Sequence, residues 1–541
     1  MTTTARYQRR LRDPVFLLSL VAALSAFVIQ SGELGTADTT VRLQTTHWLW
    51  TSQPQVPSGE LLVFGLHGRD GKLYSWYGIG QSLIFLPADL VGTFLEHLPI
   101  FANYDGTDPG VRSIVVSYST NILINVLTAM VCFRFLRLLG FTTRQAVAGV
   151  LALLFCTTHL HYAQNMMENN YILLLTMTGL TWQYEWLQTG SRRALAIGSA
   201  AFGLNLLTRL TTGLDLLAGG VFLLLVLWFD GVRSRALWFR IVSYCQIVAP
   251  VYLFFLLIDR VYQYYRFGSF TNTYVSIVAR EQRALNPSLP ANYPWEVPFR
   301  VGFFGALFTP EKSIFLVDPL VVLAILLAVV TWKRLRNDVR AYLLTAFLLL
   351  FAYISFYARY SVWSGDFAWG DRYVSTAAEM VAFISVPILL RYRHNLAKSI
   401  WWLGTLLIAI SAVVQLASLA FWLPLEIYQM ETMGHPTFVI ALRFKNIAAF
   451  ALGRMEQWGL NNIPMTQDPW DYVHITTWNF LPFLLRRVGV AQRWVVDVAF
   501  LVWVTGLAAL AWAFRRLCKM LAISHDPPPL EGSATEPQAA S

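Results

Sequence analysis

Charged side chains are scarce in this sequence. Asp, Glu, Lys and Arg make up 13% of the 541 residues, whereas 56% of the residues are hydrophobic. The mean hydropathy is +0.49. A soluble domain could not bury this much apolar surface, but a lipid bilayer accommodates it. The composition therefore predicts an all-α protein that crosses a membrane several times and is surrounded by membrane lipids.

Cysteine is also rare, and nucleotide-binding motifs are missing. The four cysteines lie within or beside apolar runs, so they indicate neither a disulfide framework nor a metal site. The sequence has no P-loop, no GxGxxG after a strand and no internal repeat. The net charge of +10 comes from short basic clusters at the ends of apolar runs, which orient membrane spans and do not indicate nucleic-acid binding.

Apolar runs of about 20 residues predict about twelve membrane-spanning helices. They lie near residues 14–31, 112–133, 143–160, 169–187, 193–209, 212–229, 239–258, 314–332, 340–358, 373–390, 399–422 and 495–514. Segment 79–98 is also apolar, but it contains Pro87, Asp89 and Glu96, and a crossing there would move most basic clusters outside. We therefore expect an interfacial or re-entrant helix at 79–98.

This topology places both termini in the cytoplasm and orients the chain in the inner (plasma) membrane. Three long segments then face outward: 32–111, 259–313 and 423–494. Residues 1–422 are expected to form one transmembrane module, followed by the outward segment 423–494 and a last span at 495–514. Residues 525–541 are rich in Pro, Ser, Ala and Glu, and the tail 515–541 is expected to be a disordered cytoplasmic segment.

The first outer loop contains a candidate acidic site. Asp38 and Arg42 lie four residues apart, on one face of a short helix expected over 38–49 at the membrane surface. The spacing fits either a local ion pair or a functional pair. The following stretch, 70–82, is rich in glycine and aromatic residues, which suits either a loop close to a sugar or phosphate or an interfacial aromatic belt.

Further polar residues stand at the outer ends of later spans. Glu168 opens a span and is either a helix-dipole partner or a site residue, and Arg209 is a candidate cation for an anionic lipid headgroup. The late loop 363–373 leads into a span that contains Glu379, seven residues after Arg372. This spacing puts both on one helix face about 10 Å apart. A site lining and a structural ion pair between helices both remain open.

Four of these features together resemble the C-type polytopic glycosyltransferase superfamily, near protein O-mannosyltransferases and lipid A aminoarabinose transferases. They are Asp38 after the first span, the D-G-x-x-Y…G-x-G stretch at 70–80, Glu168, and the W-x-G…G-x-R-Y loop at 363–373. The resemblance covers about residues 1–400. It implies that 1–422 is a catalytic module that moves a sugar, with inversion, from a polyprenyl-phosphate donor to a hydroxyl of a lipid, glycan or protein on the extracytoplasmic face.

The resemblance also implies roles for individual residues. Asp38 would be the general base, and Glu168 would position the acceptor or the sugar. The donor phosphate would be held by Arg372, Arg209 and Lys72, with Arg69 as a substitute for Lys72. Sugar rings and the prenyl chain would be contacted by Tyr74, Trp76, Trp363, Trp369, Asp366, Tyr373 and Glu379. No residue is assigned as a metal ligand, although a requirement for a divalent metal ion is left open.

Two other functions fit the same topology. A transporter or flippase of a lipid-linked saccharide would use Arg372 and Glu379 as a midway site, although such folds often show internal repeats. A glycan polymerase or ligase would share the outward loops but use pyrophosphate-linked donors.

Overall fold

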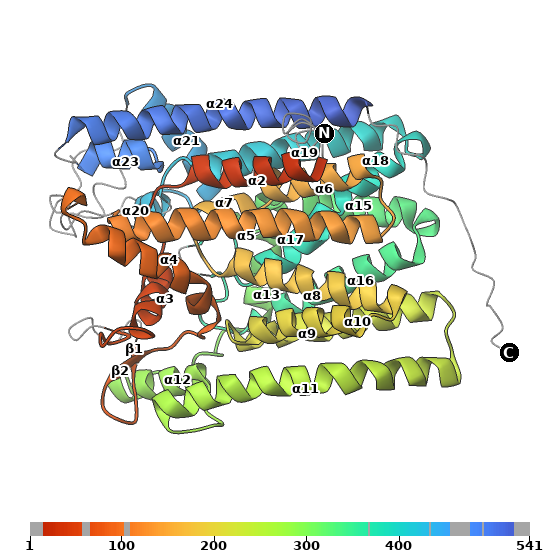
Figure 1. Ribbon diagram of the computed structural model, residues 1–541, viewed down its shortest axis with the longest axis horizontal. Helices are drawn as coiled ribbons and strands as arrows, with labels where there is room; N and C mark the ends of the chain where they lie inside the picture. The colour runs from red at the N-terminus through yellow and green to blue at the C-terminus, as the bar shows by residue number, and fades with distance from the viewer. Residues whose placement is uncertain are drawn as a thin grey trace, which may run out of the picture.

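The chain forms a bundle of long helices that run side by side (Figure 1). The structure is a computed structural model that describes residues 14–56, 65–101, 109–365, 368–422, 424–431, 434–454, 477–488 and 492–523. The helices that make up the bundle are α2 (Pro14–Ile29), α5 (Val111–Leu138), α6 (Thr143–Cys156), α7 (His159–Gln164), α8 (Asn169–Thr189), α9 (Arg192–Leu206), α10 (Gly213–Phe229), α11 (Ser234–Phe267), α14 (Ile314–Val317), α15 (Leu320–Thr331), α16 (Asn337–Tyr357), α17 (Ser375–Phe383), α18 (Ser385–Arg391), α19 (Lys398–Ser418) and α24 (Arg493–Ile523).

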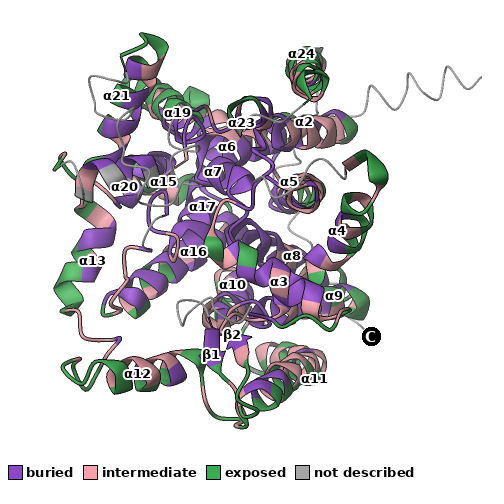
Figure 2. Ribbon diagram, turned by 90° about the vertical axis from the view of Figure 1, so that its left-hand side faces the viewer, coloured by how far each residue is buried: buried purple, intermediate pink, exposed green. Residues whose placement is uncertain are grey.

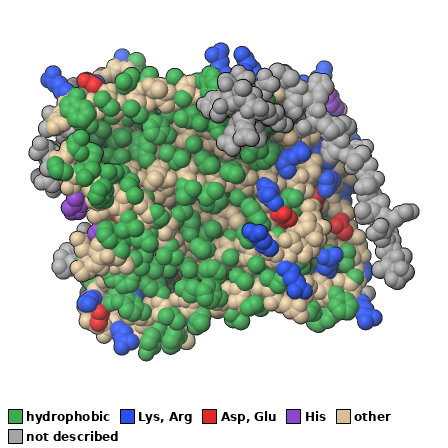
Figure 3. Space-filling model, in the orientation of Figure 1, with side chains coloured by type: hydrophobic (Ala, Val, Ile, Leu, Met, Phe, Trp, Pro, Cys, Tyr) green, Lys and Arg blue, Asp and Glu red, His purple; other side chains and the backbone are tan. Residues whose placement is uncertain are grey.

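Each predicted span coincides with one of these helices or with two consecutive short ones. Within the described ranges, six helical stretches are long and apolar enough to cross a bilayer by themselves: Val111–Leu138, Leu210–Phe229, Arg235–Phe267, Asn337–Tyr357, Lys398–Ser418 and Arg493–Ala522. A broad hydrophobic band covers the face of the molecule seen in Figure 3. The prediction of an all-α polytopic membrane protein is confirmed, while the number of crossings remains a prediction.

The centre of the bundle is α17, in which every side chain is buried. It packs against α6, α15 and α16, and buried residues concentrate around it in the view of Figure 2. By contrast, α11 and α24 lie at the periphery and expose many large apolar side chains. Because these side chains would face lipid, their exposure is the expected inside-out pattern of a membrane protein.

One end of the bundle carries the shorter elements (Figure 1, left). They are α3 (Ala37–Trp48), α4 (Gly80–Glu96), α12 (Tyr274–Leu285) and the antiparallel hairpin of β1 (Gly65–His67) and β2 (Leu73–Ser75), in which Leu66 pairs with Tyr74. Helix α13 (Phe299–Phe308) follows α12 along the chain and packs against α16. Helices are therefore present over the predicted segments 38–49 and 79–98. The α4 helix packs against α3 and α5 and exposes Phe94 and Val91, as an interfacial helix would.

The C-terminal part departs from the prediction in one place. α24 continues to Ile523, so residues 515–523 are helical and the predicted disordered tail starts too early. Residues 524–541 lie outside the described part of the chain. Within 423–494 the structure describes α20 (Pro424–Glu431), α21 (Val439–Ala451) and α23 (Leu481–Val488), and the outward orientation of this segment stays a prediction.

Candidate functional site

A small cavity of about 80 Å³ lies at the end of the bundle that carries α3 and the hairpin. Five arginines and three carboxylates line it, which gives a net charge of +2: Arg42, Arg209, Arg260, Arg266, Arg372, Asp38, Glu168 and Asp259. Aromatic residues complete the wall: Trp76, Tyr77, Tyr274 and Tyr373. A narrow cavity with excess guanidinium groups and flat apolar rings suits a phosphate joined to a sugar or a lipid.

The loop before α3 places Asp38 in this cavity. Gly35 has φ +77° and lies so close to Asn165 that a Cβ atom would stand 2.6 Å from the Asn165 Cα. Thr36 caps α3 by accepting a hydrogen bond from the Thr39 amide, and the Thr39 hydroxyl donates to the Met166 carbonyl at 3.0 Å. These contacts fix the first turn of α3, and with it Asp38, against the turn that precedes Glu168.

Arg372 reaches Asp38 from the other half of the chain. Its Nη1 atom donates to the Asp38 carboxylate at 2.7 Å, and both side chains are 14% exposed. The loop that carries Arg372 is held by Asn169, whose side-chain amide donates to the Arg372 carbonyl at 2.6 Å. Gly365, with φ +76°, packs against Arg372 so closely that a Cβ atom would clash with it at 2.8 Å.

Glu168 joins two further arginines. Its carboxylate lies 3.0 Å from Arg42 Nη2 and accepts a hydrogen bond from Arg209. Arg42 also stacks over the Tyr77 ring, with 4.0 Å between the guanidinium carbon and the ring centroid. The local Asp38–Arg42 ion pair that the four-residue spacing allowed is therefore not formed, because each side chain pairs with a residue on a different element.

The arginines of this cluster keep unused hydrogen-bond donors. Arg42 Nε and Nη1 and Arg372 Nε are buried and have no hydrogen-bond partner among the described residues. A buried guanidinium donor without a partner is costly. These atoms therefore provide places where oxygen atoms of an anionic ligand would bind.

The electrostatic environment keeps Asp38 ionised. Burial alone would raise the pKa of its carboxyl group, but the charges of Arg372 and Arg42 outweigh this effect and hold the pKa below the ordinary value of 3.8. Tyr77 also hydrogen bonds to the carboxylate. While it is paired with Arg372, Asp38 is consequently a weaker base than a free aspartate.

The arginines from α11 were missed by the sequence analysis. Arg260, Gln263 and Arg266 follow one another at a spacing of three along the last turns of α11 and line the cavity together. Arg266 donates to the carbonyls of Ser75 and Tyr77, which ties the loop after β2 to α11. Their spacing of three residues could have indicated a shared helix face. The predicted helix ended at residue 258, however, so these residues were assigned to the loop that follows it.

Several predicted phosphate or sugar contacts lie elsewhere. Lys72 is 74% exposed and pairs with Asp70 at 3.6 Å, and Arg69 lies over the Tyr264 ring. Tyr74 is buried against Tyr265 and donates to Asp70 at 3.0 Å. None of Lys72, Arg69 and Tyr74 lines the cavity, because the hairpin turns their side chains toward its own tip and toward α11.

The late loop also differs from expectation. Trp363 packs against Gly305 of α13, and Trp369 is 1% exposed and stacks on His161, so neither lines the cavity. Trp369 instead anchors the loop that presents Arg372. Asp366 lies outside the described residues. Of the predicted sugar- or lipid-contacting residues, Trp76 and Tyr373 do line the cavity.

Glu379 is buried inside the bundle, away from the cavity, and forms no ion pair with Arg372. The Thr158 hydroxyl oxygen lies 2.9 Å from Glu379 Oε1 and 3.1 Å from Asp318 Oδ2. A hydroxyl group has one proton to donate, so both contacts are hydrogen bonds only if one carboxyl group is protonated. Glu379 therefore neither lines this cavity nor pairs with Arg372, and its role at the site stays a prediction.

No group of three or more His, Cys, Asp or Glu side chains in the described ranges is arranged to hold a metal ion. Two histidines that lie two residues apart, His159 and His161, have different partners. His159 contacts Asn125 at 2.8 Å, and His161 stacks on Trp369. The divalent ion left open by the sequence stays untested.

Comparison with known proteins gives only distant likenesses. No protein-family model and no curated protein matches the sequence. Among the solved structures that match is the crystal structure of ArnT from Cupriavidus metallidurans bound to undecaprenyl phosphate, with 14% identity, 96% of this chain and 78% of that chain covered, and a TM-score of 0.40. A likeness this distant carries no argument about this chain.

Proposed function

We propose that this protein is an integral membrane glycosyltransferase that moves a sugar from a polyprenyl-phosphate donor to an acceptor hydroxyl on the extracytoplasmic face. The observation that carries the proposal is the cavity in which the Asp38 carboxylate lies among arginines with unused donors, Arg42 Nε and Nη1 and Arg372 Nε. Such a cavity offers both a proton acceptor and a phosphate cradle within one space.

In this proposal the arginines bind the donor. Arg372, Arg42 and Arg209 surround the phosphate and stabilise the negative charge that grows on it as the bond to the sugar breaks. Glu168, which holds Arg42 and Arg209, positions these two side chains and does not meet the substrate directly. The rings of Trp76 and Tyr373 provide flat apolar surfaces for the sugar or the first prenyl units.

Asp38 then acts as the general base. A donor phosphate that binds Arg372 competes with the Asp38 carboxylate for the same guanidinium group. The pKa of Asp38 consequently rises toward its ordinary value once the donor is bound, and the carboxylate becomes a better proton acceptor. The acceptor hydroxyl loses its proton to Asp38 as its oxygen attacks the anomeric carbon, with inversion of configuration.

The direct test is transfer by the purified protein in detergent micelles. The donors are undecaprenyl-phosphate-linked hexoses and pentoses, and mass spectrometry follows the release of undecaprenyl phosphate and the mass gained by envelope lipids and glycans. Transfer in micelles needs no second compartment, so it separates an enzyme from a flippase. Translocation in vesicles without any transfer would reject the proposal, and reaction only with pyrophosphate-linked donors would indicate a polymerase or ligase.

A further inference from the structure

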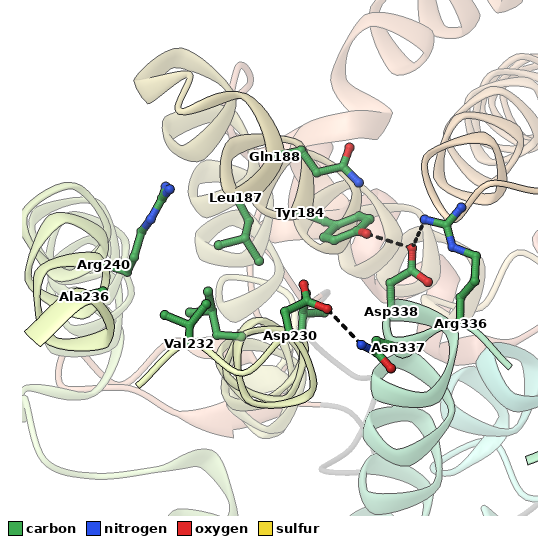
Figure 4. A pocket seen from close by; sticks show the side chains of 12 residues that line it. Tyr184, Leu187, Gln188, Asp230, Val232, Ala236, Arg240, Arg336, Asn337 and Asp338 are labelled. Carbon is green, nitrogen blue, oxygen red and sulfur yellow. Dashed lines mark hydrogen bonds and ion pairs between the residues drawn. The ribbon is translucent and has the colours of Figure 1, made fainter. Parts of the chain in front are cut away.

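A larger cavity of about 760 Å³ lies at the other end of the bundle (Figure 4). It forms where the C-terminal ends of α8 and α10 meet the N-terminal ends of α11 and α16. Glu168 at the start of α8 lines the small cavity, and Gln188 in its last turn lines the large one. Twenty residues of helix span about 30 Å, which is the thickness of a hydrocarbon core. The two cavities therefore lie near opposite membrane surfaces.

The charges of this large cavity are separated. Asp338 accepts hydrogen bonds from Arg336 at 2.8 Å and from Tyr184 at 2.9 Å, so this acid and base satisfy each other. Arg240 on α11, in contrast, has no hydrogen-bond or ion-pair partner among the residues that the structure describes. Asp230 at the end of α10 is contacted by Asn337 Nδ2 at 3.1 Å. One free cation and one available carboxylate thus stand on different helices (Figure 4).

The surroundings of the large cavity are those of a membrane surface. Its apolar wall consists of Leu187, Val226, Leu227, Val232 and Ala236. The exposed rings of Trp228, Trp238 and Phe239 lie on the same ends of α10 and α11, and aromatic residues in such positions mark the headgroup level. Lys and Arg side chains also gather at this end in Figure 3. The cavity therefore opens where lipid headgroups and the first acyl carbons lie.

We propose that this cavity binds a phospholipid whose headgroup carries both a phosphodiester and a primary ammonium group, as in phosphatidylethanolamine. The phosphate pairs with Arg240, the ammonium group donates to Asp230, and the upper acyl carbons pack on Leu187 and Val226. The charged residues of the lining have a net charge of zero, so they match a zwitterion. An anionic headgroup would leave Asp230 facing negative charge, and a choline headgroup has no N–H to donate. The inference depends on the chain crossing a bilayer and not on the proposed transfer activity.

The first experiment uses the wild-type protein. The protein is delipidated in detergent and mixed with phosphatidylethanolamine, phosphatidylcholine or phosphatidylglycerol of identical acyl chains, and native mass spectrometry measures the lipid retained. We expect phosphatidylethanolamine to be retained at least about fivefold more than either other lipid. Equal retention of the three lipids, or displacement of phosphatidylethanolamine by inorganic phosphate, would overturn the proposal.

Two variants locate the bound lipid. Arg240→Ala should weaken retention of phosphatidylethanolamine about tenfold, the usual effect of losing a charged hydrogen bond. The matched control Arg235→Ala removes the same charge from the first turn of α11 but lies outside the cavity over Phe239, so retention should change less than about twofold. Leu187→Trp, which places a bulkier ring in the wall where the upper acyl carbons would pack, should also reduce retention. Equal losses in the two arginine variants, or full retention in Leu187→Trp, would refute the site.

Discussion

Replacing Asp38 by Asn removes the proposed general base with almost no change in side-chain volume. General-base assistance is worth about 10²–10⁴-fold, so kcat should fall by this factor, equivalent to about 3–5 kcal/mol in the barrier. The amide leaves Arg372 without its carboxylate partner at 2.7 Å and raises the net charge of the cavity. Affinity for undecaprenyl phosphate, measured by calorimetry in micelles, should therefore stay the same or increase.

Stability has to be measured beside activity. Breaking a buried ion pair costs about 3–5 kcal/mol, and we expect the lower end here because both side chains are 14% exposed. The matched control is Asp259→Asn, which removes the same charge from the same cavity but pairs with Arg260. The reasoning fails if folded Asp38→Asn keeps more than about a tenth of the wild-type kcat, or if Asp259→Asn loses as much.

Three further results are expected. Lys72→Ala should leave the donor KM within about twofold of wild type because this side chain is 74% exposed, whereas Arg372→Ala should raise the donor KM at least about tenfold. Similar KM changes for the two variants in steady-state kinetics would contradict the placing of Arg372, and not Lys72, at the donor phosphate. Glu379→Gln should melt within about 1 kcal/mol of wild type and keep its activity, because the Gln carbonyl oxygen can accept the hydrogen bond that the Thr158 hydroxyl donates to Glu379 Oε1. A large loss in both measurements would mean that Glu379 is charged. Because Arg372 and Arg42 depress the pKa of Asp38, the stability from its ion pair is complete above the ordinary value of 3.8 and is lost as the pH falls through the lower folded-state pKa. The melting difference between wild type and Asp38→Asn should thus be constant from about pH 5 to 8, and a difference that already shrinks between pH 7 and 5 would contradict the assignment.

The fold was largely predictable because bilayer thickness imposes a length on every span. The apolar runs matched helices, and basic clusters indicated that 79–98 differs from its neighbours. Helix ends were less predictable. The last turns of α11 are polar, but contacts of Arg266 with the Ser75 and Tyr77 carbonyls help to extend the helix to Phe267, and hydropathy does not report such contacts.

The candidate site was predictable only in part. Asp38 and Arg372 are 334 positions apart, and the motif order and sidedness of the C-type resemblance suggested them both. The pairing of Arg42 with Glu168 could not be inferred, because the four-residue spacing favours an ion pair between Arg42 and Asp38. The contact of Glu379 with Thr158 could not be inferred either, because helical spacing predicts a shared face but does not say which neighbour that face meets.

The position of α11 has a consequence for how a substrate would enter. This helix forms one wall of the small cavity through Arg260 and Arg266. In the most apolar stretch of the same helix, however, only 6% of the residues are buried within the protein. The wall is thus also a boundary with the hydrocarbon phase. A long isoprenoid tail would be able to remain among the acyl chains while its charged head slides sideways past α11, so we expect bulky substitutions on the lipid-facing side of α11 to slow donor entry without altering the chemical step.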